Sequence, residues 1–129
     1  MKLAIVTAAI VAAAFSTTLA ISQVGQKSPT AQQTQRIPQF ENEDVKVWKS
    51  VVYPNAPLTM HRHDHPRVII ALKGGTMKIV EKTGESEEHP WETGHAYWLP
   101  ANPPNTQHAD VNAGKDPIEV MVVELEKER

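Results

Sequence analysis

The chain has 129 residues, of which 40% are hydrophobic, and this is enough apolar material for the core of one ordinary domain. It has no cysteine, which excludes disulfides and thiol chemistry. Its 13 basic and 15 acidic residues give a net charge of −2 at pH 7, and no clustered basic face of the kind that binds nucleic acid is visible.

The first twenty residues, MKLAIVTAAIVAAAFSTTLA, have the layout of a secretory signal. Lys2 precedes an apolar run from Leu3 to Phe15, which is too short to span about 30 Å of hydrocarbon comfortably. Thr18-Leu19-Ala20 offers a small-x-small cleavage site. We therefore predict a signal peptide over residues 1–20 and a periplasmic or secreted protein with no membrane span after cleavage. An uncleaved anchor is the alternative.

Residues 21–43 are predicted to form a flexible spacer. Their central part, SQVGQKSPTAQQTQRIPQ, is polar and rich in glutamine, and its hydrophobic residues follow neither the period of a strand nor that of a helix.

From residue 44 the composition changes: short runs rich in Val, Ile, Tyr and Trp are separated by turn-forming residues. This pattern predicts one all-β domain over residues 44–126. The expected strands are residues 45–53, 57–63, 67–73, 76–82, 95–100, 107–111 and 118–126. So many short strands need a closed barrel or a second sheet to protect their edges.

Three local features refine this prediction. Gly74-Gly75 can adopt positive φ at both positions, and this predicts a tight hairpin between the strands on either side. Residues 83–94 are acidic and are expected to form an exposed connection whose Trp91 folds back onto the body. The strand expected at 45–53 is suited to pairing across a subunit interface, and this predicts a homodimer.

The segment HRHDH, residues 61–65, places two histidines on one face of a strand. His61 and His63 are two positions apart and point the same way, so they can form half of a metal site. The alternative is a polar, solvated strand end. His65 is either a further donor or an exposed ring. A third histidine, His108, is expected on a later strand.

At these histidines the sequence resembles the cupin family, and the resemblance covers about residues 51–125. The first cupin motif contains His-x-His, then a glutamate three or four residues later, then a glycine. His61, His63 and Gly74 match it. The second motif runs Gly, five residues, Pro-x-Gly, two residues, His, three residues, Asn. The residues that match it are Gly94, Pro100, His108 and Asn112.

The resemblance implies a cupin jelly-roll barrel in which His61, His63 and His108 face the interior. Many cupins bind iron, manganese, zinc, copper or nickel through such residues. The metal expected here is a divalent transition metal, such as iron, manganese or zinc.

The sequence departs from the motifs at two positions. Asn102 replaces the turn glycine of the second motif, and asparagine tolerates the positive φ that such a turn requires. Arg67 stands where the glutamate ligand of the first motif is expected, and a guanidinium keeps its charge beside a metal cation.

Three outcomes remain open for Arg67. It can turn aside and pair with Asp64, Asp110 or a glutamate. It can bind a substrate carboxylate bidentately beside the metal. In the third outcome the site binds no metal.

The sequence leaves two functions open. One is an exported non-haem metal oxygenase or oxidoreductase acting on a small organic acid. The other is a non-enzymatic cupin that binds a small ligand or a metal. The residue pattern identifies neither the substrate nor a catalytic residue.

Overall fold

The computed structural model describes residues 32–127, and within this range every regular element is a strand. The five-stranded sheet has the order β1 (Gln35–Glu41), β2 (Val45–Val52), β9 (Ile118–Leu125), β4 (Arg67–Lys73), β7 (Ala96–Leu99). The four-stranded sheet has the order β3 (Leu58–His61), β8 (His108–Asn112), β5 (Gly75–Glu81), β6 (Ser86–Trp91). No helix in residues 32–127 is long and apolar enough to cross a membrane.

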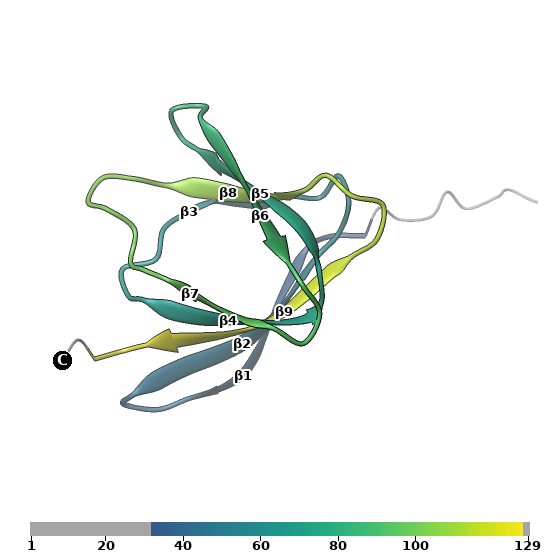
Figure 1. Cartoon of the computed structure of the whole chain (residues 1–129). Coiled ribbons are helices and arrows are strands. Elements are labelled where there is room, and N and C mark those ends of the chain that lie inside the picture. The colour runs from purple at the N-terminus through teal and green to yellow at the C-terminus, as the bar shows by residue number, and fades with distance from the viewer. Residues whose placement is uncertain (1–31, 128–129) are drawn as a thin grey trace, which may run out of the picture.

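The two sheets face each other across a barrel (Figure 1). From β2 to β5 the chain changes sheet at every strand, and it changes again between β6, β7, β8 and β9. The paired strands within each sheet are antiparallel. The prediction of an all-β jelly-roll barrel is therefore confirmed.

The hairpin predicted at Gly74-Gly75 is wrong, because β4 and β5 lie in different sheets. Both glycines are needed for close packing, and neither has positive φ. A Cβ on Gly74 would collide with the carbonyl oxygen of Trp91, and one on Gly75 would lie 2.7 Å from Ile118 Cγ1. The pair marks the point where the chain crosses from one sheet to the other.

The prediction of a flexible spacer is wrong for residues 35–41, which form β1 against β2. All seven side chains of β1 are exposed, so no alternation of apolar residues signals the strand. The sheet therefore begins before residue 44. The signal peptide predicted for residues 1–20, and the spacer up to residue 31, lie outside the described residues.

A second strand that the sequence did not predict, β6, lies within residues 83–94, which were expected to form an exposed connection. It pairs with β5, and Trp91 is buried as expected. The strand proposed for dimer pairing, β2, has β1 on one edge and β9 on the other, so it cannot pair with another subunit. The homodimer itself stays a prediction.

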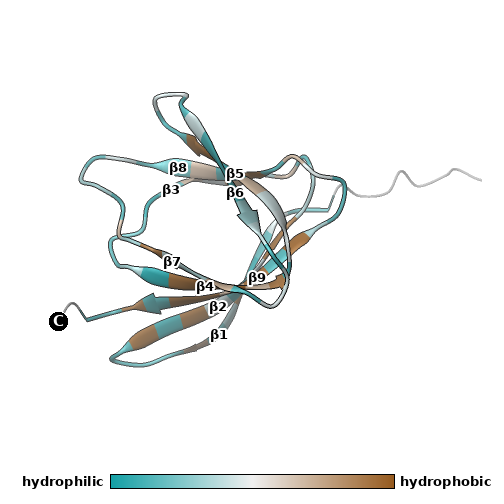
Figure 2. Ribbon diagram, in the orientation of Figure 1, coloured by the Kyte–Doolittle hydropathy of each residue, from teal (hydrophilic) through white to brown (hydrophobic). Residues whose placement is uncertain are grey.

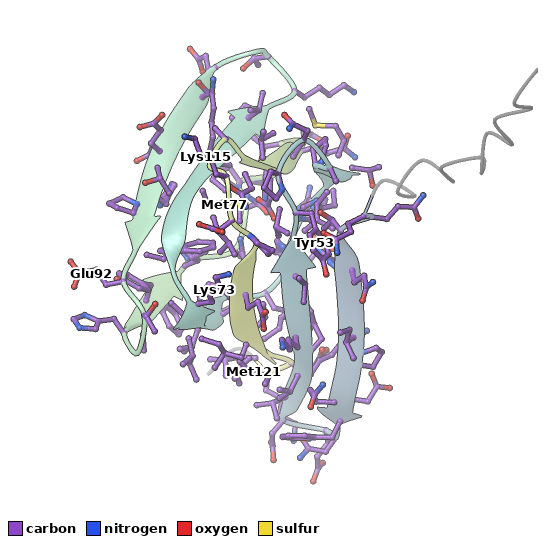
Figure 3. The ribbon with its side chains drawn as sticks, turned by 90° about the vertical axis from the view of Figure 1, so that its right-hand side faces the viewer. Tyr53, Lys73, Met77, Glu92, Lys115 and Met121 are labelled. Carbon is purple, nitrogen blue, oxygen red and sulfur yellow. The ribbon has the colours of Figure 1, made fainter. Side chains whose placement is uncertain are left out.

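Strands β2, β4 and β9 are rich in apolar residues (Figure 2). Buried side chains alternate with less buried ones along β4 and β9, and β2 is buried over most of its length. The apolar set fills the space between the sheets, where Met77 is among the most deeply buried side chains (Figure 3). On β9 the inward series Ile118, Val120, Val122 continues with Glu124, and β4 begins with the buried Arg67. Since β4 and β9 pair Arg67 with Glu124, both strands place their charged residue at the same end of the barrel.

Candidate metal centre

The structure brings the three predicted histidines together. His61, at the end of β3, and His108, at the start of β8, are directly opposite each other in the strand register. His63 lies two residues beyond β3. The ring centroids are 4.5 Å apart for His61 and His108, 5.0 Å for His61 and His63, and 5.7 Å for His63 and His108. One ring nitrogen from each lies within 4.8 Å of the others, so the three can hold one metal ion.

The tautomer of His61 is fixed by the backbone. Its Nδ1 is 2.7 Å from the carbonyl oxygen of Thr59, which can only accept a hydrogen bond. The proton therefore lies on Nδ1, and Nε2 carries a lone pair. This Nε2 is buried and has no hydrogen-bond partner among the described residues. A buried acceptor without a donor is unfavourable, and a bound cation would satisfy it.

His63 is positioned mainly by the five-stranded sheet. Its Nδ1 donates to Glu124 Oε2 at 2.7 Å, and its ring stacks parallel to Trp48 with centroids 6.2 Å apart. Its backbone N–H donates to Asn102 Oδ1 at 2.7 Å. Burial lowers the pKa of His63, and Glu124 opposes that shift. The ring is therefore neutral at pH 7, with Nε2 as its free nitrogen.

The pKa of Glu124 depends on the same contact. Burial alone would raise it, but the hydrogen bond from His63 and the nearby positive charges bring the pKa of Glu124 below its ordinary value. Glu124 is therefore an ionised acceptor that orients His63. It was missed at the sequence level. The available signal was a charged residue on the otherwise apolar inward face of β9.

His108 is the most buried of the three rings, with 2% of its surface exposed. Burial lowers its pKa to about 4, against the opposing effect of Asp110. Its Nδ1 is 3.3 Å from the amide nitrogen of Asn102, which donates this hydrogen bond because Oδ1 is engaged by His63. The proton of the neutral ring therefore lies on Nε2. Metal binding through Nε2 requires that proton to move to Nδ1.

Asn102 thus contacts two of the three histidines. Asparagine tolerates positive φ, but Asn102 does not adopt it: the non-glycine residues with positive φ in the described range are Asn55 and Asn105. The role of Asn102 at this position lies in its side chain, which hydrogen-bonds to His63 and His108. Asn112, matched to the end of the second motif, is buried and binds the carbonyl oxygens of Val52 and Asp116.

Arg67 is buried at the start of β4, and its Nη1 donates to the carbonyl oxygen of Pro100 at 3.3 Å. Among the described residues it forms no ion pair within 4.0 Å, and Asp64 pairs with Arg62 instead at 2.7 Å. Of the three outcomes left open for Arg67, direct pairing with a carboxylate is therefore absent among the described residues. Burial lowers the pKa of Arg67, and the charges of Asp110 and Glu124 act in the opposite direction.

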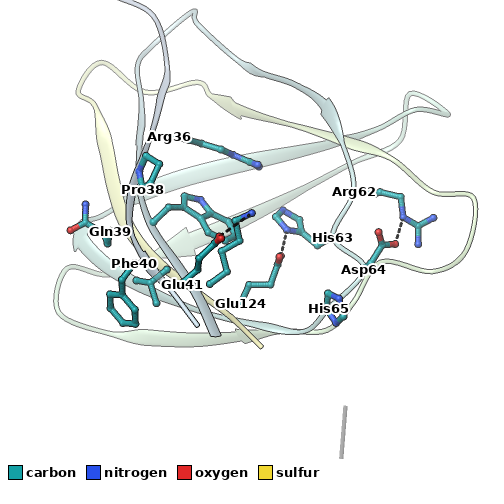
Figure 4. Close-up of a pocket in the computed structure, with 13 residues that line it drawn as sticks. Arg36, Pro38, Gln39, Phe40, Glu41, Arg62, His63, Asp64, His65 and Glu124 are labelled. Carbon is teal, nitrogen blue, oxygen red and sulfur yellow. Dashed lines mark hydrogen bonds and ion pairs between the residues drawn. The ribbon is translucent and has the colours of Figure 1, made fainter. Parts of the chain in front are cut away.

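Two sizeable cavities adjoin the histidines, besides a small one of about 30 Å³ that His63 and Arg67 border. One of about 650 Å³ lies between β1 and the loop of residues 62–65, and its wall includes His63, Glu124, Arg36 and the half-buried His65 (Figure 4). His65 is not part of the histidine group. The other cavity, of about 190 Å³, is bordered by Arg67, His108, Asn102, Trp91 and Leu99, and its wall also includes Glu81 and Glu87.

Comparison with known proteins identifies the fold. No family model matches the sequence, and neither does any curated protein. A cupin domain from Bordetella pertussis superposes with a TM-score of 0.65 and 21% identity, over 74% of this chain and 95% of that one. An RmlC-like cupin with a double-stranded β-helix fold from Methanocaldococcus jannaschii superposes with a TM-score of 0.57 and 19% identity. The match covers 81% of this chain and 91% of that one. The chain has the cupin fold. An RmlC-like cupin from Desulfovibrio desulfuricans has the same fold, with a TM-score of 0.55 and 18% identity. The match covers 88% of this chain and 98% of that one.

Proposed function

We propose that this cupin binds one divalent transition metal through His61, His63 and His108 and takes a small carboxylate-bearing ligand beside it. The observation that carries the proposal is the unpartnered, buried Nε2 of His61 within a cluster of three imidazoles. The positions of Glu124 and Arg67 also support the proposal. Glu124 orients His63, and Arg67 lies near the cluster without a carboxylate bonded to it.

Neutral imidazoles suit iron and zinc ions, and oxygen ligands such as a carboxylate suit manganese. When bound, such a metal supplies Lewis acidity, and iron or manganese also supplies redox chemistry. His63 and His108 are neutral at pH 7 because burial lowers the pKa of both rings. They therefore compete little with protons for the ion at pH 7.

The carboxylate site is the cavity bordered by Arg67 and His108. Arg67 uses Nη1 for the carbonyl of Pro100, and its remaining N–H groups are available to bind a carboxylate. Trp91 and Leu99 provide an apolar wall that excludes water from the bound acid. The small volume, about 190 Å³, favours an acid of a few carbon atoms.

The reaction class that fits this arrangement is oxidation of a small organic acid by a non-haem metal oxygenase or a related oxidoreductase. Three protein nitrogens leave coordination positions open for an acid and a co-substrate. We also propose, from the signal-like residues 1–20, that the enzyme works in the periplasm or outside the cell.

Metal analysis of the purified chain tests the first part. We expect close to one transition metal ion per chain, and loss of the metal in His61→Ala and His63→Ala. His95→Ala is the matched control, because His95 is exposed and lies outside the cluster. A chain that takes up none of Fe(II), Mn(II) or Zn(II) would contradict the proposal.

Oxygen consumption by the iron-loaded chain with a panel of short carboxylic acids tests the second part. Consumption that depends on one acid supports the enzyme. Tight binding of an acid without turnover would instead identify a non-enzymatic cupin, which is the alternative function.

A further inference from the structure

The position of Asp110 suggests a role in this site. Asp110 lies two residues after His108 on β8, so both side chains enter the barrel from the same face of the four-stranded sheet. Its neighbours in the register are Leu58 on β3 and Ile79 on β5, and 17% of its side chain is exposed. The carboxylate is therefore held in the middle of the sheet that carries His61 and His108.

The two oxygens of Asp110 face two histidines at once. Oδ2 is 3.7 Å from His61 Nε2, and Oδ1 is 3.6 Å from His108 Nε2. Both distances are too long for hydrogen bonds. Nitrogen and oxygen ligands that share one ion, each at about 2.1 Å, lie about 3.0–3.5 Å apart. The spacing to these two rings is close to that of ligands around a common cation. Asp110 is not in the group whose ligand atoms all lie within 4.8 Å of one another, so sharing an ion with His63 as well requires its side chain to move.

Asp110 and Glu124 have different roles. Glu124 contacts Nδ1 of His63, on the side of the ring away from the free nitrogen, and so acts as a positioning residue. Asp110 faces the Nε2 atoms of the other two rings. Its shortest contacts with these nitrogens are 3.6 and 3.7 Å, longer than a hydrogen bond, so both oxygens are available to a cation.

We propose that Asp110 is a fourth protein ligand of the metal, a role that rests on the proposed function above. Arg67 occupies the position where the cupin motif has its glutamate, and β8 supplies the missing negative charge instead. The carboxylate reduces the net charge of the loaded site by one unit, which offsets the cost of a cation near Arg67. The donor set is three imidazoles and one carboxylate, which favours zinc, iron or manganese over Cu(I).

Titration of Co(II) and Zn(II) into the purified chain, by calorimetry and by the visible absorption of Co(II), tests this assignment. We expect Asp110→Asn to weaken Co(II) binding at least tenfold and to change the Co(II) spectrum. Asp110→Glu should restore part of the affinity. Asp64→Asn is the matched control, because it removes the same charge from an exposed residue beside His63, and it should bind like the unmodified chain.

Circular dichroism and thermal melts of the metal-free variants establish that each one folds, and Asp110→Glu keeps the test valid if Asp110→Asn does not. Unchanged affinity and an unchanged spectrum in Asp110→Asn would overturn the role of Asp110 and leave the three-histidine site intact. If the unmodified chain binds neither ion, the proposed function fails, and the role of Asp110 fails with it.

Discussion

The two halves of the histidine cluster are held in different ways. His61 and His108 lie opposite each other on paired strands of the four-stranded sheet, so backbone hydrogen bonds fix their spacing. His63 stands on a loop and depends on side chains, with Glu124 and Trp48 contacting its ring and Asn102 its backbone. The first pair should therefore tolerate changes around it, whereas the position of His63 should be sensitive to single substitutions in the opposite sheet.

Removal of Glu124 is expected to have the largest effect on metal affinity, because it removes a side chain that positions His63. Glu124→Ala leaves the Nδ1 proton of His63 without an acceptor, and we expect metal affinity to fall by about 10- to 100-fold, as is typical for groups that orient a metal ligand. Glu124→Gln keeps an acceptor without its charge and should lie between that variant and the unmodified chain. Calorimetric titration measures the change. Equal affinities for all three chains would mean that the loop holds His63 by itself.

Arg67→Glu is expected to raise metal affinity at least tenfold, which is about 1.4 kcal/mol. It replaces a buried cation by a carboxylate at a position paired with Glu124. The metal-free variant should melt at a lower temperature, because the new charge faces Asp110 and Glu124.

Arg62→Glu is the control for Arg67→Glu. It makes the same charge change on a less buried loop residue and should leave affinity unchanged. An increase of the same size in both variants would show a general charge effect, with no specific role for position 67.

A smaller effect is expected from Asn102→Asp. The carboxylate can accept from the backbone N–H of His63 and also from His108 Nδ1–H. It would therefore stabilise the tautomer of His108 whose Nε2 is free to bind metal, and we expect affinity to rise about threefold or more. Asn105→Asp, in the same loop, is the control. A lower affinity in Asn102→Asp would mean that this tautomer does not limit binding.

The smallest effect is the pH dependence of stability in the metal-free chain. Burial lowers the pKa of His63 and His108, so below their ordinary value of 6.5 the unfolded chain binds protons that the folded chain does not. Stability should be complete above pH 6.5 and decrease as the pH falls toward about 4, the pKa of His108. Thermal melts measure this decrease, and His108→Asn should flatten it. His95→Asn, which alters an exposed ring, should not.

Short runs rich in Val, Ile, Tyr and Trp between turn-forming residues were sufficient to predict the all-β barrel, because the central strands of the larger sheet are built from such runs. This pattern missed β1 and β6, whose side chains are mostly exposed and whose strand structure comes from main-chain pairing. The Gly74-Gly75 hairpin was wrong because local turn preference does not determine which sheet a strand joins.

At the site, the three histidines could be predicted from their spacing and their resemblance to the cupin motifs. Glu124 could not, since it lies 61 residues from His63 in the sequence and meets it only when the two sheets close. The hydrogen-bonding role of Asn102 could not be predicted either, because the cupin motif has a glycine, without a side chain, at this position.

The position of β1 at the edge of its sheet should allow this strand to separate locally from the rest of the fold. This strand is at the edge of its sheet, pairs only with β2 and buries none of its side chains. Few apolar contacts oppose its separation, so its amide protons should exchange with solvent much faster than those of β9, which has a neighbour on each side. Since β1 supplies one wall of the larger cavity, fluctuations of this strand should vary the width of that cavity while the histidine cluster behind it stays in place.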